Sequence, residues 1–165
     1  MTMEIGGSFS LVDHYGKAVT DVDYHGRHVI VFFGFTHCKV VCPRALSRLT
    51  RILEALGPLS DRLTPLYVTV DPDRDDPARM RAFLERDYPR FTGLTGTPEQ
   101  IEHAKTAYRV FAERKPDPDD PEDYQVPHTA MTYVMGPDGN YVTHFNDALD
   151  EALVTSRLTA ILEDA

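Results

Sequence analysis

Residues 29–43 read Val-Ile-Val-Phe-Phe-Gly-Phe-Thr-His-Cys-Lys-Val-Val-Cys-Pro, and they carry the strongest indication of the fold. The first seven residues are largely β-branched or aromatic with no polar alternation, which is typical of a strand covered on both faces. Pro43 then opens a helix whose apolar positions recur three and four residues apart until Gly57-Pro58 stops it. The stretch therefore predicts a central strand, a loop that carries both cysteines, and a helix.

The flanking sequence adds elements on both sides of this unit. Strands are predicted at residues 9–12, 18–22, 63–70, 130–135 and 141–145, and helices at 77–88, 98–110 and 150–162. Asp76-Pro77 and Thr97-Pro98 each supply a helix N-cap followed by a first-turn proline. This order predicts an α/β thioredoxin-like fold, a central mixed sheet flanked by helices, with an extra N-terminal β-hairpin and an inserted helix.

The composition predicts a single domain over residues 1–165, because the chain has the length of one well-buried core and no shift in composition divides it. Residues 115–123 hold three prolines and five acidic side chains. This segment is too polar to bury and too interrupted by proline for a helix, so we expect an exposed loop there.

The charge balance bears on partners. Seventeen Lys and Arg against twenty-six Asp and Glu give a formal net charge of -9, which works against unspecific binding to nucleic acid or anionic lipid. The longest apolar run, residues 29–35, is far shorter than the roughly 18 to 20 residues of a membrane span. We expect no nucleic-acid partner, and membrane contact only through an anchor outside this chain.

The two cysteines, Cys38 and Cys42, are the only ones in the chain. They lie where a strand passes into a helix, and the unpaired amides of a helix N-terminus stabilise thiolates. Residues four apart at helical pitch have Cα atoms about 6 Å apart, which permits a disulfide or shared coordination of one ion. A redox pair of the thioredoxin kind normally has two intervening residues, so the spacer of three favours a metal. Thiolate ligands favour Cu(I) or Zn(II).

A third ligand is expected among seven histidines. His128 is the best candidate, because it precedes the predicted strand 130–135, which neighbours the cysteine corner in a thioredoxin layout. His37 adjoins Cys38 and is assigned a supporting role, and His25 and His28 have a spacing that permits a second, adventitious metal site. The remaining histidines, expected to be solvated or hydrogen-bonded, are His14, His103 and His144.

Several motifs together resemble the Sco/SenC family of copper chaperones over about residues 5–162. They are Phe33-Gly-Phe-Thr-His-Cys38, Cys42-Pro43, Val70-Asp-Pro-Asp-Arg-Asp75 and Asp123-Tyr-Gln-Val-Pro-His128. The resemblance implies that Cys38, Cys42 and His128 bind one copper ion, as Cu(I) or Cu(II). It also implies a metallochaperone rather than an enzyme, one that assists assembly of the binuclear copper site of cytochrome c oxidase subunit II.

The resemblance further implies other partners and a compartment. The implied further partners are another periplasmic copper chaperone or a thioredoxin-like reductant. The implied compartment is the periplasmic face of the bacterial inner membrane, in preference to the mitochondrial intermembrane space. The alternative function is a thiol-disulfide oxidoreductase that reduces the cysteines of a copper-receiving partner, with Cys38 as nucleophile and Cys42 as resolving thiol. A peroxidase of the peroxiredoxin kind is not favoured, because this chain lacks the proline-threonine-cysteine environment of that family.

One position departs from the family pattern. The family usually has Asp immediately before the histidine, whereas this chain has Pro127. A carboxylate beside a metal ligand typically changes metal affinity by about 10- to 100-fold, so the substitution predicts altered copper binding or a drift toward redox work. Val126-Pro127 is also a candidate for the cis-proline that faces the cysteine pair in thioredoxin folds. Asp71 is interpreted either as a group that tunes the thiols or as part of a polar turn before the next helix.

Overall fold

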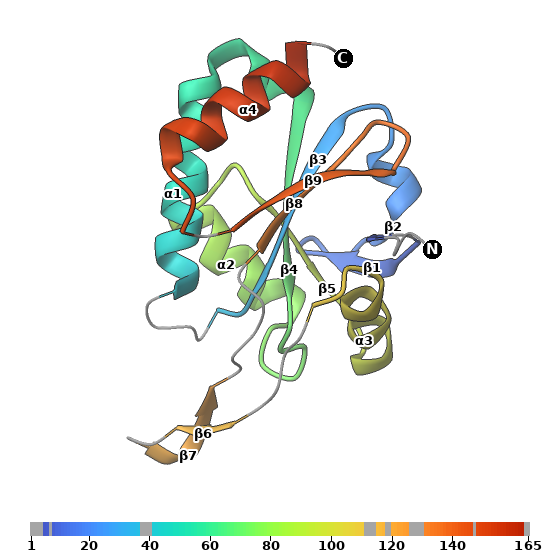
Figure 1. Cartoon of the computed structure of the whole chain (residues 1–165). Coiled ribbons are helices and arrows are strands. Elements are labelled where there is room, and N and C mark those ends of the chain that lie inside the picture. Colours follow the sequence, from blue (N-terminus) through green and yellow to red (C-terminus); the bar gives the residue numbers. More distant parts are fainter. Residues whose placement is uncertain are drawn as a thin grey trace.

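The computed structural model describes residues 5–6, 8–36, 41–110, 115–117, 120–125, 131–146 and 148–163. Its sheet has seven strands in the order β2-β1-β5-β4-β3-β8-β9. The helices α1 and α4 lie side by side, α2 packs along β5, and α3 packs near β1 (Figure 1). The predicted thioredoxin-like fold, a central mixed sheet flanked by helices, is confirmed, and so is the additional N-terminal hairpin.

The bounds of the elements are as follows. The strands are β1 (Ser10–Asp13), β2 (Ala18–Thr20), β3 (His28–Gly34), β4 (Leu63–Thr69), β5 (Thr92–Thr95), β6 (Lys115–Asp117), β7 (Asp120–Gln125), β8 (Met131–Met135) and β9 (Tyr141–Asn146). The α-helices are α1 (Val41–Leu56), α2 (Pro77–Asp87), α3 (Pro98–Ala107) and α4 (Glu151–Glu163). Two 3-10 helices, η1 (Asp21–Tyr24) and η2 (Gly57–Arg62), complete the described elements.

The centre of the sheet is the pair β3 and β4, which run parallel with Phe32 opposite Tyr67. Every residue of β3 is buried, as its continuous apolar run predicts. Because successive side chains point to opposite faces, Phe32 stacks on Tyr67 on one face, whereas Phe33 packs against Tyr108 on the other. Both faces of the central strands are therefore covered by aromatic side chains.

The strand β5, which the sequence patterns do not predict, joins the N-terminal hairpin to the sheet. It has only four residues and includes Gly93, so it carries little strand signal. It pairs parallel with β4 and antiparallel with β1. The predicted helix 98–110 also ends early, at Ala107, because the chain adopts a left-handed backbone at Arg109 with φ 58°.

The acidic segment differs from its prediction as a loop. Its backbone forms β6 and β7, an antiparallel pair in which Pro116 lies opposite Tyr124, and Figure 1 shows this hairpin projecting away from the sheet. Proline is tolerated on edge strands, where the missing N–H removes no ladder bond, and both strands of a two-stranded ribbon are edges. The prolines therefore exclude a helix but not a ribbon.

Candidate metal centre

The cysteine corner lies at the carboxyl end of the central strands. β3 ends at Gly34, and α1 begins at Val41, so Cys42 is the second residue of that helix. The sixteen-residue α1 presents its N-terminus to this corner, where the macrodipole and unpaired amides favour an anionic thiolate. This placement agrees with the sequence-based expectation for Cys42. Cys38 and His37 lie outside the described residues.

The chain approaches β8 from this same end of the sheet. β8 pairs antiparallel with β3, with Thr132 opposite Phe32, so Met131 lies where β3 ends. His128 precedes Met131 by three positions and lies outside the described residues, as do Val126 and Pro127. The topology therefore brings the end of β3, the start of α1 and the start of β8 to one end of the sheet, whereas the ligand set itself stays a prediction.

The described part of the corner is organised by the carboxylate of Asp75, a fully buried residue. Its Oδ2 accepts hydrogen bonds from the backbone N–H of Thr36 at 3.0 Å and from the Thr69 hydroxyl at 2.7 Å. Its Oδ1 accepts the Thr36 hydroxyl, and that hydroxyl oxygen accepts from Arg79 Nε at 2.8 Å. Arg79 Nε is also 3.7 Å from Asp75 Oδ1. A buried negative charge is thereby satisfied by three hydrogen bonds and a nearby guanidinium.

The backbone of Asp75 also has hydrogen-bond partners. Its N–H donates to the Asp71 carbonyl at 3.0 Å, and its own carbonyl accepts the Thr95 hydroxyl at 2.6 Å. Thr36 is the second residue after β3, Thr69 ends β4, and Thr95 ends β5. Asp75 thus connects the carboxyl ends of three adjacent strands. Sequence reasoning did not assign this residue a role, although it closes the quoted Asp-Pro-Asp-Arg-Asp motif.

Asp71 is a second buried carboxylate near the corner. Its Oδ2 accepts a hydrogen bond from Arg74 Nε, and the Arg74 guanidinium lies 5.9 Å from the centre of the Phe35 ring. The N-cap of α2 is the neighbouring Asp76, which accepts from the backbone N–H of Arg79 at 2.8 Å. The polar-turn interpretation of residues 71–76 is therefore confirmed by the structure.

The histidines expected to be hydrogen-bonded have partners. His14 Nδ1 accepts the backbone N–H of Gly93 at 2.8 Å, and His103 Nε2 is 3.1 Å from the Ser8 carbonyl oxygen. His144 Nδ1 bonds the Tyr141 hydroxyl. Burial lowers the pKa of His14, with smaller opposing effects from nearby carboxylates. These contacts favour structural roles for the three side chains.

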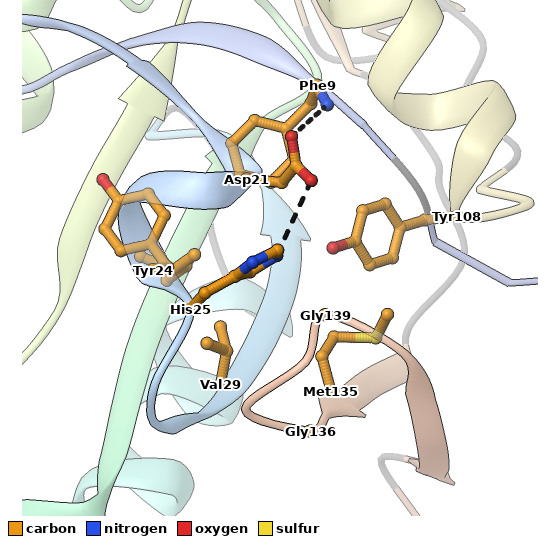
Figure 2. A pocket seen from close by; sticks show the side chains of 10 residues that line it. Phe9, Asp21, Tyr24, His25, Val29, Tyr108, Met135, Gly136 and Gly139 are labelled. Carbon is orange, nitrogen blue, oxygen red and sulfur yellow. Dashed lines mark hydrogen bonds and ion pairs between the residues drawn. The ribbon is translucent and has the colours of Figure 1, made fainter.

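The two histidines considered for an adventitious metal site line separate cavities. His25 lines a small cavity of about 20 Å³ together with Asp21 and Tyr108, and Figure 2 shows its ring directed toward the Asp21 carboxylate, with Nε2 and Oδ2 3.8 Å apart. His28 lines another cavity, beside Asp61. Among the described residues, no group of three or more His, Cys, Asp or Glu side chains is arranged to hold a metal ion.

The fold and the position of Cys42 define a class, the thioredoxin-like proteins with a cysteine in the first turn of the helix that follows the central strand. The SCO1/SenC family model matches residues 1–163, and the chain belongs to this family. Within the described ranges, no helix combines the length and apolar character needed to cross a bilayer.

Relatives and solved structures agree with this membership. The mouse mitochondrial SCO1 homolog is 39% identical over 158 residues, which cover 94% of this chain and 55% of the relative. The human mitochondrial SCO1 homolog is 38% identical over 143 residues, 86% of this chain and 47% of the relative. The chain thus spans about half the length of these curated relatives.

Two similar structures are described as having copper bound. Bradyrhizobium japonicum ScoI is 40% identical with a TM-score of 0.85, and the match covers 94% of this chain and 98% of that one. Arabidopsis thaliana ScoI is 32% identical with a TM-score of 0.91, covering 98% and 99%. A 21% identical relative, BsSco, described as a member of the Sco family of cytochrome c oxidase assembly proteins, shares the fold with a TM-score of 0.75.

Proposed function

We propose that this protein is a copper metallochaperone that carries one ion on Cys38, Cys42 and His128. The observation that carries the proposal is membership of the SCO1/SenC family together with similarity to copper-bound structures along nearly the whole chain. The donor set fits the cargo, because two thiolates and an imidazole suit the soft Cu(I) ion. The backbone of Cys42 lies in the first turn of α1, and a helix N-terminus favours negative charge.

The proposed recipient rests on the same membership. We propose that the loaded protein assists assembly of the binuclear copper site of cytochrome c oxidase subunit II, on the periplasmic face of a bacterial inner membrane. Its other proposed partners are a periplasmic copper chaperone that loads it or a thioredoxin-like reductant that keeps its cysteines reduced. The net charge of -9 favours basic surfaces on these partners.

A thiol-disulfide oxidoreductase is the second candidate function. It is favoured by the thioredoxin-like fold, in which the backbone of Cys42, the proposed resolving residue, lies in the first turn of α1, and a helix N-terminus lowers the pKa of nearby thiols. The two functions differ in what they require of His128. A third copper ligand is needed for the metal site, whereas disulfide exchange proceeds through the cysteines alone.

Anaerobic titration of the reduced protein with Cu(I) tests the proposal. One copper per chain is expected, with stoichiometric binding lost in Cys38→Ser and in Cys42→Ser. His128→Ala should weaken Cu(I) binding, while the matched control His103→Ala, which removes an imidazole of α3 that contacts the Ser8 carbonyl, should leave it unchanged. Stoichiometric copper on a variant lacking both cysteines would refute the proposed site. Unchanged copper affinity in His128→Ala, together with unchanged rates of disulfide exchange, would favour the reductase.

A further inference from the structure

The contacts of Asp75 point to the loop that carries the cysteines. Thr36 is the last described residue before that loop and stands two positions ahead of Cys38. Both its backbone N–H and its hydroxyl are held by the same carboxylate. Since the carboxylate is also bonded to Thr69 at the end of β4, it fixes the departure point of the loop relative to the neighbouring strand.

We propose that Asp75 is a positioning residue of the copper site, holding Thr36 so that the Cys38–Cys42 loop leaves β3 in one conformation. The inference rests on the proposed function, which supplies the role of the two cysteines. Two residues of extended chain span at most about 7 Å, so a displacement of Thr36 is passed on to Cys38 with little room for compensation. A loop already ordered before the ion arrives avoids the cost of ordering it on binding.

The hydroxyl of Thr36 acts both as a hydrogen-bond donor and as an acceptor. It donates to Asp75 Oδ1 and accepts from Arg79 Nε at 2.8 Å, so both of its hydrogen-bonding roles are used. An amide with its NH2 group toward the Thr36 hydroxyl would remove the acceptor of that hydroxyl's proton, and the reverse orientation would remove the acceptor of the Thr36 backbone N–H and the Thr69 hydroxyl. The geometry therefore requires a carboxylate at position 75 and a hydroxyl at position 36.

Four variants separate positioning from general stability. Thr36→Val removes the hydroxyl at nearly constant volume, and Thr36→Ser retains it as the conservative rescue. Asp75→Asn removes the charge while conserving shape. Thr95→Val is the matched control, because it deletes a hydrogen bond to the Asp75 carbonyl on the side of β5 and leaves the contacts of Thr36 intact. Each variant is examined for Cu(I) affinity by chelator competition, for alkylation rate of the cysteines in the copper-free reduced protein, and for unfolding in urea.

The expected result is a loss of about 10-fold in Cu(I) affinity for Thr36→Val and Asp75→Asn, the lower end of the range for residues that orient metal ligands. Both variants should also show faster alkylation, because their loop is less constrained. Thr36→Ser and Thr95→Val should match the unmodified protein in both measurements, even though Thr95→Val loses stability. If Asp75→Asn does not fold, the comparison of Thr36→Val with Thr36→Ser decides the matter.

Two results would overturn the inference. One is a folded Thr36→Val protein with unchanged copper affinity and unchanged alkylation. The other is an equal loss in Thr95→Val, which would make the effect one of stability alone. Failure of the proposed function looks different, because the unmodified protein would then not hold copper through its cysteines. The alkylation rates would still report whether Asp75 and Thr36 order the loop.

Discussion

Removal of the Asp75 carboxylate by Asp75→Ala should be among the most destabilising single changes in the chain. The residue is fully buried, and the change leaves three donors without their acceptor: the Thr36 N–H, the Thr36 hydroxyl and the Thr69 hydroxyl. At about 1 kcal/mol for each buried group left unsatisfied, the loss is about 3 kcal/mol. The ion pair with Arg79 adds little, because that side chain is 47% exposed.

Urea unfolding followed by far-ultraviolet circular dichroism measures this loss, with the slope of the transition compared between variants. A loss of about 3 kcal/mol corresponds to a fall in Tm of about 6 to 12 °C for a chain of this length. A double-mutant cycle with Thr36→Val should give a coupling energy of about 1 kcal/mol, since both changes delete the same hydroxyl contact. Thr95→Val should cost about 1 kcal/mol without coupling to Thr36. A loss below about 1 kcal/mol for Asp75→Ala, or coupling near zero, would refute the reasoning.

The remaining predictions concern acid stability, packing and copper binding. Burial lowers the pKa of His14 below the ordinary value of 6.5, so the unfolded chain binds a proton at a higher pH than the folded protein does. Stability should therefore decline as the pH is lowered through about 6.5. In His14→Gln, the urea midpoint should decrease less as the pH is lowered. Gly93→Ala should cost about 1 kcal/mol in urea unfolding, because an added Cβ would lie 2.8 Å from the end of the Leu84 side chain in α2, which would have to shift. The exposed control Val142→Ala should cost under about 0.5 kcal/mol, and equal costs would contradict the packing. Pro127→Asp should tighten Cu(II) binding by up to about 10- to 100-fold in a competition titration, and unchanged affinity would argue against a carboxylate role beside His128.

Sequence patterns predicted most elements of this fold for a local physical reason. The strand at 28–34 is apolar without alternation because it is covered on both faces, and the helices at 77–87 and 98–107 begin at an N-cap followed by proline. Such signals depend on neighbours within a few residues, so the sequence is sufficient to recognise them. The ribbon at residues 115–125 was not predicted, because proline and charge content excludes a helix there but is compatible with either a loop or a two-stranded ribbon.

The sequence alone predicted the cysteine pair between a strand and a helix and the resemblance to the Sco/SenC family. These predictions depend only on the identity and spacing of residues. The tertiary structure decided what surrounds them. Asp75 is separated from Thr36 by 39 residues, and only the parallel pairing of β3 with β4 brings its carboxylate under the start of the cysteine loop. In the sequence, Asp75 is one of several acidic residues in a turn, and nothing local distinguishes it from exposed Asp73. Burial and a hydrogen-bond partner distant in sequence give Asp75 its role, and both arise when the strands assemble into a sheet.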